Sequence, residues 1–206
     1  MAPRLPRTFF ARSSVEVAPG LLGHVLARRL PDGSVLRARI VETEAYEPDD
    51  PASHAFRGRT PRNATMFGPP GRLYVYFTYG MHFCMNVVTR AQGQGSAVLL
   101  RAGEPLEGLD AMAERRRTGV ARDLCRGPAR WTQAFGVDRD LDGEDLVRSE
   151  RVWLERGSVV GRIATSPRVG IRVGTDRPWR FAEAECRWTS GRAALSPSSA
   201  RAPSRP

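Results

Sequence analysis

Two short segments carry the residue types that could bind and cleave a flat, ring-containing substrate. One reads Leu73-Tyr-Val-Tyr-Phe-Thr-Tyr-Gly80 and places three tyrosines within six residues. The other runs from Ile40 to Tyr46 and carries glutamates at positions 42 and 44. Tyrosine rings stack on flat aromatic groups, and a carboxylate can take a proton from water. Together the two segments predict a site that stacks a base and cleaves a bond beside it.

The second segment has the spacing of a β-strand with one functional face. Alternate side chains of a strand point to the same side, so Glu42, Glu44 and Tyr46 share a face. Carboxylates two residues apart lie about 7 Å from each other, near enough to interact but too far to share a proton. A general base for water suits this setting if an arginine keeps it ionised. The alternative is a pair of solvated surface glutamates.

The tyrosine-rich segment is predicted to form a strand that ends in a turn. Tyr74 and Tyr76 share one face, while Phe77 and Tyr79 share the other. We expect Phe77 to be a core residue and Tyr76 to face a pocket. Tyr79 precedes Gly80 at the expected hairpin tip, from which its ring could insert between DNA bases. The alternative, a packed ring with a hydrated hydroxyl, is equally compatible with the residues.

The charge pattern favours a polyanionic partner. The net charge is +10, and all 32 basic side chains are arginine, a bias that genome composition can also produce. Without lysine, no side-chain amine can form a Schiff base; only the α-amino terminus could, and it lies in a segment expected to be flexible. Cleavage of a glycosidic bond is therefore expected to use activated water. Turns with neighbouring arginines predict that Arg62, Gly127 and Arg130 contact the phosphate backbone of a nucleic acid, although ordinary turn chemistry explains these residues as well.

Composition argues against several other classes of protein. Three widely spaced cysteines fit neither a disulfide framework nor a zinc site, and three unclustered histidines do not suggest a metal centre. We therefore expect no metal and no cofactor. No stretch approaches the ~20 apolar residues of a membrane span, and no apolar segment follows the basic N-terminus. We expect a cytoplasmic protein without membrane association.

The 206 residues suit one domain. Few βαβ units are recognisable, which favours an α+β domain with a mostly antiparallel sheet and surrounding helices. We expect a long loop over 47–70, which in a compact domain is typical of function or disorder. The other predicted elements are a helix over 15–27 starting at Pro19-Gly20, a hairpin over 28–46, a strand-turn-strand over 73–88, a strand over 96–101, helices over 106–117 and 124–136, and strands over 152–155, 168–173 and 180–184.

Several segments occur in an order that matches a known family. The segments are Val41-Glu-Thr-Glu-Ala-Tyr46, Thr60-Pro-Arg-Asn63, Met66-Phe67, Leu73-Tyr-Val-Tyr76, Tyr79-Gly-Met81, Met85-Asn86, Val98-Leu-Leu-Arg-Ala102 and Glu104-Pro-Leu-Glu-Gly108. With them the chain resembles the alkyladenine (3-methyladenine) DNA glycosylase family, particularly its compact bacterial members, from about residue 7 to 181. A departure follows Phe181, where 182–190 replaces the family's Gly-x-Pro-x-Val-Ser-like ending.

The resemblance implies roles for individual residues. Glu44 matches the general base that activates water, and Arg101 matches the arginine that places both the water and the carboxylate. Tyr46, His54 and Tyr76 match the walls of the base pocket.

Two further roles concern DNA. Tyr79 matches the wedge that fills the gap left by a flipped nucleotide, and Asn86 matches the residue that disfavours guanine through its exocyclic amine. The implied fold is a single mixed domain, 7–189, with a curved sheet and a hairpin that enters the minor groove. Residues 1–6 are expected to be flexible, and the tail 190–206 disordered.

The implied activity is excision of alkylated or deaminated purines, such as 3-methyladenine, 7-methylguanine and hypoxanthine, from double-stranded DNA. Activated water would leave an abasic site, without lyase activity. We expect a monomer in the bacterial cytoplasm, associated with the nucleoid through DNA. The alternatives are a non-catalytic nucleic-acid-binding module and a free-nucleoside hydrolase.

Overall fold

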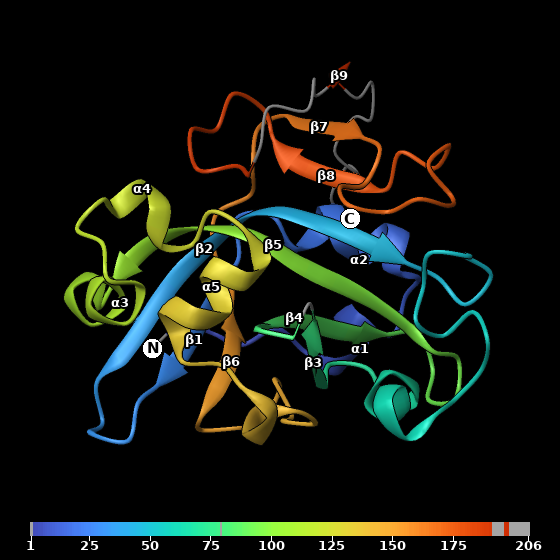
Figure 1. The fold of residues 1–206 in the computed structure, drawn as a ribbon, viewed down its shortest axis with the longest axis horizontal. Helices are drawn as coiled ribbons and strands as arrows, with labels where there is room; N and C mark the ends of the chain where they lie inside the picture. The colour runs from blue at the N-terminus through green and yellow to red at the C-terminus, as the bar shows by residue number, and fades with distance from the viewer. Residues whose placement is uncertain (1, 79, 191–195, 198–206) are drawn as a thin grey trace.

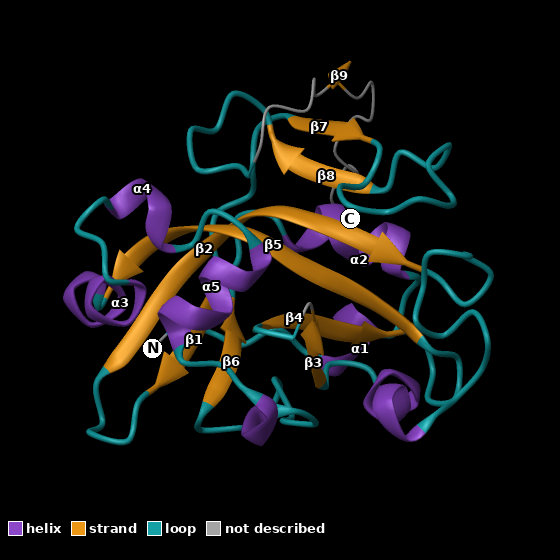
Figure 2. Cartoon of the chain, viewed as in Figure 1, coloured by secondary structure: helices purple, strands orange, loops and turns teal. Residues whose placement is uncertain are grey.

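Two long antiparallel strands, β2 (Val35–Tyr46) and β5 (Ser96–Glu107), cross the middle of the molecule in the computed structural model (Figure 1). The structure describes residues 2–78, 80–190 and 196–197. Helices lie around the sheet rather than between its strands (Figure 2). The chain thus folds as a single mixed domain of helices and a curled antiparallel sheet, as the sequence predicts.

The described strands form one sheet, in the order β3-β4-β5-β2-β8-β7-β9; in addition, β1 pairs with β2, and β6 pairs with β1. The remaining strands are β1 (Val25–Arg29), β3 (Leu73–Thr78), β4 (His82–Thr89), β6 (Val152–Glu155), β7 (Ile163–Ser166), β8 (Arg180–Glu183) and β9 (Ser196–Pro197). The helices are α1 (Arg7–Phe10), α2 (Ser14–Leu21), α3 (Leu109–Arg116), α4 (Ala121–Leu124) and α5 (Pro128–Phe135), with the 3₁₀ turns η1 (Pro61–Phe67) and η2 (Arg139–Leu141).

The strand β2 is the element that curls the sheet. Its first half pairs with β1, and its residues 42–44 pair with β8. Its register against β5 shifts around Glu42, and such irregularities bend a strand and strengthen its twist. The side chains from Ile40 to Ala45 are all buried. The bend and the burial together bring the face that carries Glu42 and Glu44 into the interior.

The two predicted hairpins are confirmed, with one correction. The chain turns between β1 and β2 and again between β3 and β4. Phe77 was expected in the core but is 37% exposed, because burial falls off toward the end of β3. Its ring lies 5.0 Å from that of Phe83 between centroids. Tyr79 lies outside the described residues. That this hairpin enters DNA stays a prediction.

The first predicted helix begins earlier and is shorter than expected. A capping box starts α2: the Ser13 hydroxyl accepts from the Glu16 amide, and the Glu16 carboxylate accepts from the Ser13 amide. Pro19 and Gly20 lie inside the helix rather than at its start. After Leu21 the chain turns into β1, so 22–27 is not helical.

The late strands differ from the prediction as well. The segment 168–173 is a loop, and the strand beside β8 is β7. Arg168 in this loop is held by contacts to Asp50 and Ala45 rather than by pairing with a strand. The strand β5 also runs further than predicted, so α3 starts only at Leu109.

The domain limits 7–189 stay a prediction, but the described ends contact the sheet. Leu5 is buried, and its amide donates to the carbonyl of Leu154 in β6 at 3.0 Å. Ser190 is buried next to Glu42. Of the predicted tail, only Ser190 and β9, which pairs with β7, belong to the described residues.

The core tolerates little change where α5 crosses β5. Gly103 lies against Trp131, and a Cβ added to Gly103 would be 2.8 Å from Cζ2 of that fully buried ring. Gly103→Ala is therefore expected to lower the free energy of unfolding by about 1–3 kcal/mol. Urea titration measures the change. Gly119→Ala is the control, because nothing lies within 4 Å of its added Cβ. Equal unfolding free energies for the two variants would contradict this packing.

Candidate active site

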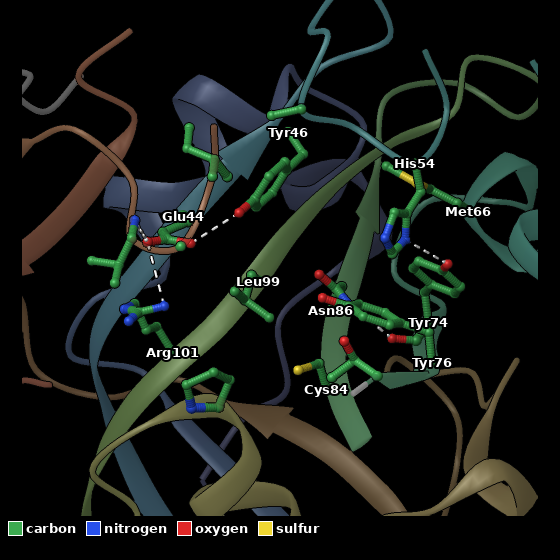
Figure 3. A pocket seen from close by; sticks show the side chains of 16 residues that line it. Glu44, Tyr46, His54, Met66, Tyr74, Tyr76, Cys84, Asn86, Leu99 and Arg101 are labelled. Carbon is green, nitrogen blue, oxygen red and sulfur yellow. Dashed lines mark hydrogen bonds and ion pairs between the residues drawn. The ribbon is translucent and has the colours of Figure 1, made fainter. Parts of the chain in front are cut away.

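A pocket of about 410 Å³ opens between the long strands and the β3–β4 hairpin. Its walls come from β2, β3, β4 and β5, from the start of α5, and from the loop residues around His54 and Val169. Figure 3 shows Glu44, Tyr46 and Arg101 on one side and His54, Tyr74 and Tyr76 on the other. The two sequence segments that suggested chemistry therefore meet across one cavity.

The Glu44 carboxylate is fully buried, and three groups hold it. The Tyr46 hydroxyl donates to Oε2 at 3.0 Å, and the Val169 amide donates to Oε1 at 2.8 Å. Arg101 Nη1 lies 3.5 Å from Oε1. Burial raises the pKa of Glu44, whereas the Arg101 charge and the two hydrogen bonds oppose that rise. The outcome is a carboxylate with a raised pKa, which is suited to accepting a proton from water.

Arg101 links this carboxylate to a second one. Glu42 is also fully buried, and its Oε1 lies 3.0 Å from Arg101 Nε, although the N–H does not point along a hydrogen bond. Arg180 Nε donates to the same oxygen at 2.6 Å, and the Ser190 amide donates to Oε2 at 2.5 Å. The predicted shared face of the two glutamates is thus present, and it is buried rather than solvated. Arg180 and Ser190 were missed, because nothing local marks them.

The opposite wall is aromatic and uncharged. The rings of His54 and Tyr76 lie 4.5 Å apart edge to face, and His54 Nδ1 shares a 3.0 Å hydrogen bond with the Tyr74 hydroxyl. Burial lowers the pKa of His54, aided by the charge of Arg62. Burial raises the pKa of Tyr74 to about 12 and that of Tyr76 still further. At neutral pH this wall is therefore a set of neutral rings.

Asn86 and Tyr74 complete the pocket. Asn86 lies on β4, where its side-chain amide donates to the Tyr74 carbonyl at 3.1 Å. Asn86 lines the pocket, as do Tyr46, His54 and Tyr76, so the structure brings these predicted residues together. Tyr74 was not among the predicted pocket residues, yet its alternation with Tyr76 on one strand face was the signal that could have found it.

The three residues predicted to contact the DNA backbone do not line the pocket. Arg62 donates to the Phe77 carbonyl at 3.1 Å and lines an open groove beside β3. Gly127 precedes α5, whose first residue, Pro128, lines the pocket. Arg130 forms a 2.9 Å ion pair with Asp123.

Within 2–78, 80–190 and 196–197, no group of three or more His, Cys, Asp or Glu side chains could hold a metal ion. In the same part of the chain no helix is both long and apolar enough to cross a membrane.

A buried carboxylate facing neutral aromatic rings is an arrangement suited to hydrolysis beside a flat base. Comparison with known proteins shows the family of the chain. The family model described as methylpurine-DNA glycosylase (MPG) matches residues 8–187. A relative from Burkholderia lata, assigned the name of a 3-methyladenine DNA glycosylase, is 53% identical over 91% of each chain. A relative from Streptomyces avermitilis, which carries the same name, is 48% identical over 98% of this chain and 94% of its own length.

The human protein named DNA-3-methyladenine glycosylase is 46% identical over 91% of this chain and 68% of its own length. The chain therefore belongs to the methylpurine-DNA glycosylase family, and the resemblance drawn from the sequence motifs is confirmed. By that membership it is a DNA glycosylase, an enzyme of base excision repair.

Proposed function

We propose that the protein flips alkylated and deaminated purines out of duplex DNA and hydrolyses their N-glycosidic bond, leaving an abasic site. One observation carries the proposal: the buried Glu44 carboxylate faces a pocket walled by neutral aromatic rings. The lesions are of the 3-methyladenine, 7-methylguanine and hypoxanthine type. The names of the relatives supply the first of these substrates.

Base flipping gives the first stage of selection. Extruding a nucleotide costs a few kcal/mol of stacking and pairing, and less for a damaged base that pairs badly. Tyr79 fills the vacated space in the duplex. Arg62, Gly127 and Arg130 contact the DNA backbone, where positive charge and exposed amides favour phosphate.

The pocket gives the second stage. An alkylated purine is cationic, and aromatic faces such as those of Tyr46 and Tyr76 attract a desolvated cation by up to ~2 kcal/mol. The Glu44 charge adds to this attraction, since the carboxylate lines the same pocket. Asn86 disfavours unmodified guanine, whose exocyclic amine would clash with it.

Glu44 then acts as the general base. Its carboxylate removes a proton from a water molecule on the sugar face opposite the base, and the water oxygen bonds to the anomeric carbon as the base leaves. The transition state is oxocarbenium-like, and the attack is of the inverting kind. Arg101 keeps Glu44 ionised and helps to place the water. A cationic purine leaves without protonation, whereas hypoxanthine needs a proton.

The reaction ends at the abasic site because no lysine is available to attack the sugar. The protein is thus a monofunctional glycosylase, working as a monomer on double-stranded DNA in the bacterial cytoplasm and bound to the nucleoid through that DNA. It needs no cofactor.

The experiment uses two labelled duplexes, one with a hypoxanthine and one with an alkylated purine, followed by hot alkali. We expect strand cleavage only after alkali, faster for the cationic base, and binding that weakens steeply with salt. Cleavage without alkali would contradict the monofunctional mechanism. Binding without base release would favour a binding module, and release from free nucleosides alone would favour a nucleoside hydrolase.

A further inference from the structure

Behind the Tyr46 wall of the pocket lies a buried ion pair that the proposed reaction does not use. The side chains of Arg168 and Asp50 are both fully buried. Removing two charges from water is costly, and a buried pair is weak evidence for stability as such. The question is therefore what this pair holds in place.

Arg168 joins three parts of the chain at once. Its guanidinium binds both oxygens of Asp50, with Nη2 to Oδ1 at 2.9 Å and Nη1 to Oδ2. Nη1 also donates to the Ala45 carbonyl of β2 at 2.9 Å, and Nη2 to the Gly174 carbonyl at 3.2 Å. The loop 168–174 is thereby fastened to the end of β2 and to the segment that follows it.

The same guanidinium lies against an aromatic wall of the pocket. Its Cζ is 4.7 Å from the centroid of the Tyr46 ring and 5.3 Å from that of Trp179. Only a planar guanidinium can stack on a ring while binding a carboxylate with two parallel hydrogen bonds. The Tyr46 ring, which is also tethered to Glu44 through its hydroxyl, thus has Arg168 stacked against it.

The next residue reaches the reacting carboxylate directly. Val169 lines the pocket, and its amide donates to Glu44 Oε1 at 2.8 Å. Because Val169 is covalently attached to Arg168, the ion pair with Asp50 also sets where this amide points. Two of the three groups that hold Glu44, the Tyr46 hydroxyl and the Val169 amide, therefore depend on Arg168.

We propose that Arg168, clamped by Asp50, is a positioning residue that fixes the Tyr46 ring and the Val169 amide, and through them the flipped base and the Glu44 carboxylate. The proposal rests on the proposed glycosylase function, and it deepens that function by assigning an essential support to residues that touch neither base nor water. A misplacement of about 1 Å in such a support can cost 10²-fold in rate.

The charges around Glu44 predict how the pH dependence should respond. The ionisable groups facing it are the cations of Arg101 and Arg168, the anion of Glu42, and the neutral side chains of Tyr46, Tyr76 and Cys84. The Arg168 cation and the Val169 amide both favour the ionised form of the Glu44 carboxylate. Losing Arg168 removes the cation and loosens the amide. The pKa of Glu44 should therefore rise, and the acid limb of the rate profile should move to higher pH.

The test compares Arg168→Met with Arg177→Met in single-turnover release of an alkylated purine. Arg177 is the matched control, because it also stacks on Trp179, at 4.6 Å, and pairs with a carboxylate, Asp49, that is largely exposed. We expect Arg168→Met to lower the plateau rate about 10²-fold and to shift the acid limb upward. Arg177→Met should stay within about twofold, since exposed ion pairs contribute little.

Unfolding curves separate positioning from folding. An Arg168→Met protein that melts earlier but keeps the wild-type plateau rate and acid limb would overturn the proposal. If that variant does not fold, Asp50→Asn decides, because it keeps the size of the side chain but removes the charge that clamps Arg168. A wild-type profile in Asp50→Asn would also overturn the proposal. Absence of base release by the wild-type protein would instead contradict the glycosylase function itself.

Discussion

Glu44→Gln is expected to abolish base release while leaving DNA binding intact. Glutamine has nearly the same shape but cannot take a proton from water, and loss of a general base typically costs about 10²- to 10⁴-fold in rate. The carboxylate is fully buried among Tyr46, Val169 and Arg101, and among the described residues that line the pocket it is the only carboxylate. Single-turnover release of an alkylated purine measures the rate, and a gel-shift titration measures binding.

Glu47→Gln is the matched control for this variant. Glu47 directly follows β2 and is also buried, but it pairs with Arg90 and Ser14 and does not line the pocket. It should lose stability and keep its rate once folded. A Glu44→Gln protein with full activity would refute the assignment of Glu44 as the base, and one that no longer binds DNA would point to a role in recognition.

Arg101→Leu should lower both activity and stability, and both effects should depend on pH. The cation lies 3.0 Å from Glu42 and 3.5 Å from Glu44, and both carboxylates are fully buried. Without it Glu42 retains its ion pair with Arg180, but Glu44 keeps only its two hydrogen bonds and the weaker influence of the Arg168 charge. Removing one partner of a buried pair costs about 3–5 kcal/mol, so the variant should be strongly destabilised at neutral pH.

The direction of the pH effect follows from the pKa of Glu44. Burial already raises this pKa and the Arg101 charge opposes the rise, so removing Arg101 should raise it further. A carboxyl whose pKa is higher in the folded than in the unfolded protein favours folding at low pH, and this stability is lost as pH rises through the folded-state pKa. Arg101→Leu should therefore be least destabilised in acid, and its rate should recover partly in alkali.

Urea titrations and rate profiles across the pH range check these expectations. Arg39→Leu serves as the control, because Arg39 also bridges two glutamates, Glu104 and Glu183, each at 2.7 Å, but at partly exposed positions outside the pocket. Its stability should change by a small amount and its acid limb should not move. An Arg101→Leu acid limb identical to that of the wild type would show that Arg101 does not hold Glu44 ionised.

Local sequence pattern was enough to specify the strand faces and their contents. Alternation along β2 and β3 is local, since each side chain's direction follows from its position in the strand, and so the shared faces of Glu42 with Glu44 and of Tyr74 with Tyr76 could be predicted. The ordered motifs also predicted the family, because they come from several separate segments of the chain and occur in one fixed order. The absence of lysine is a property of composition alone, and it excludes a lysine Schiff base whatever the fold.

Which charges meet depends on the folded chain and not on any one segment. Arg168 lies 118 positions from Asp50, and Arg180 lies 138 positions from Glu42. Among 32 arginines, spacing cannot distinguish these two from the others. The loop at 168–173 had the composition of a strand, but a buried ion pair and a contact to Glu44 hold it as a wall of the pocket. Local periodicity specifies a face, whereas pairing across the fold depends on packing between segments that are far apart in the sequence.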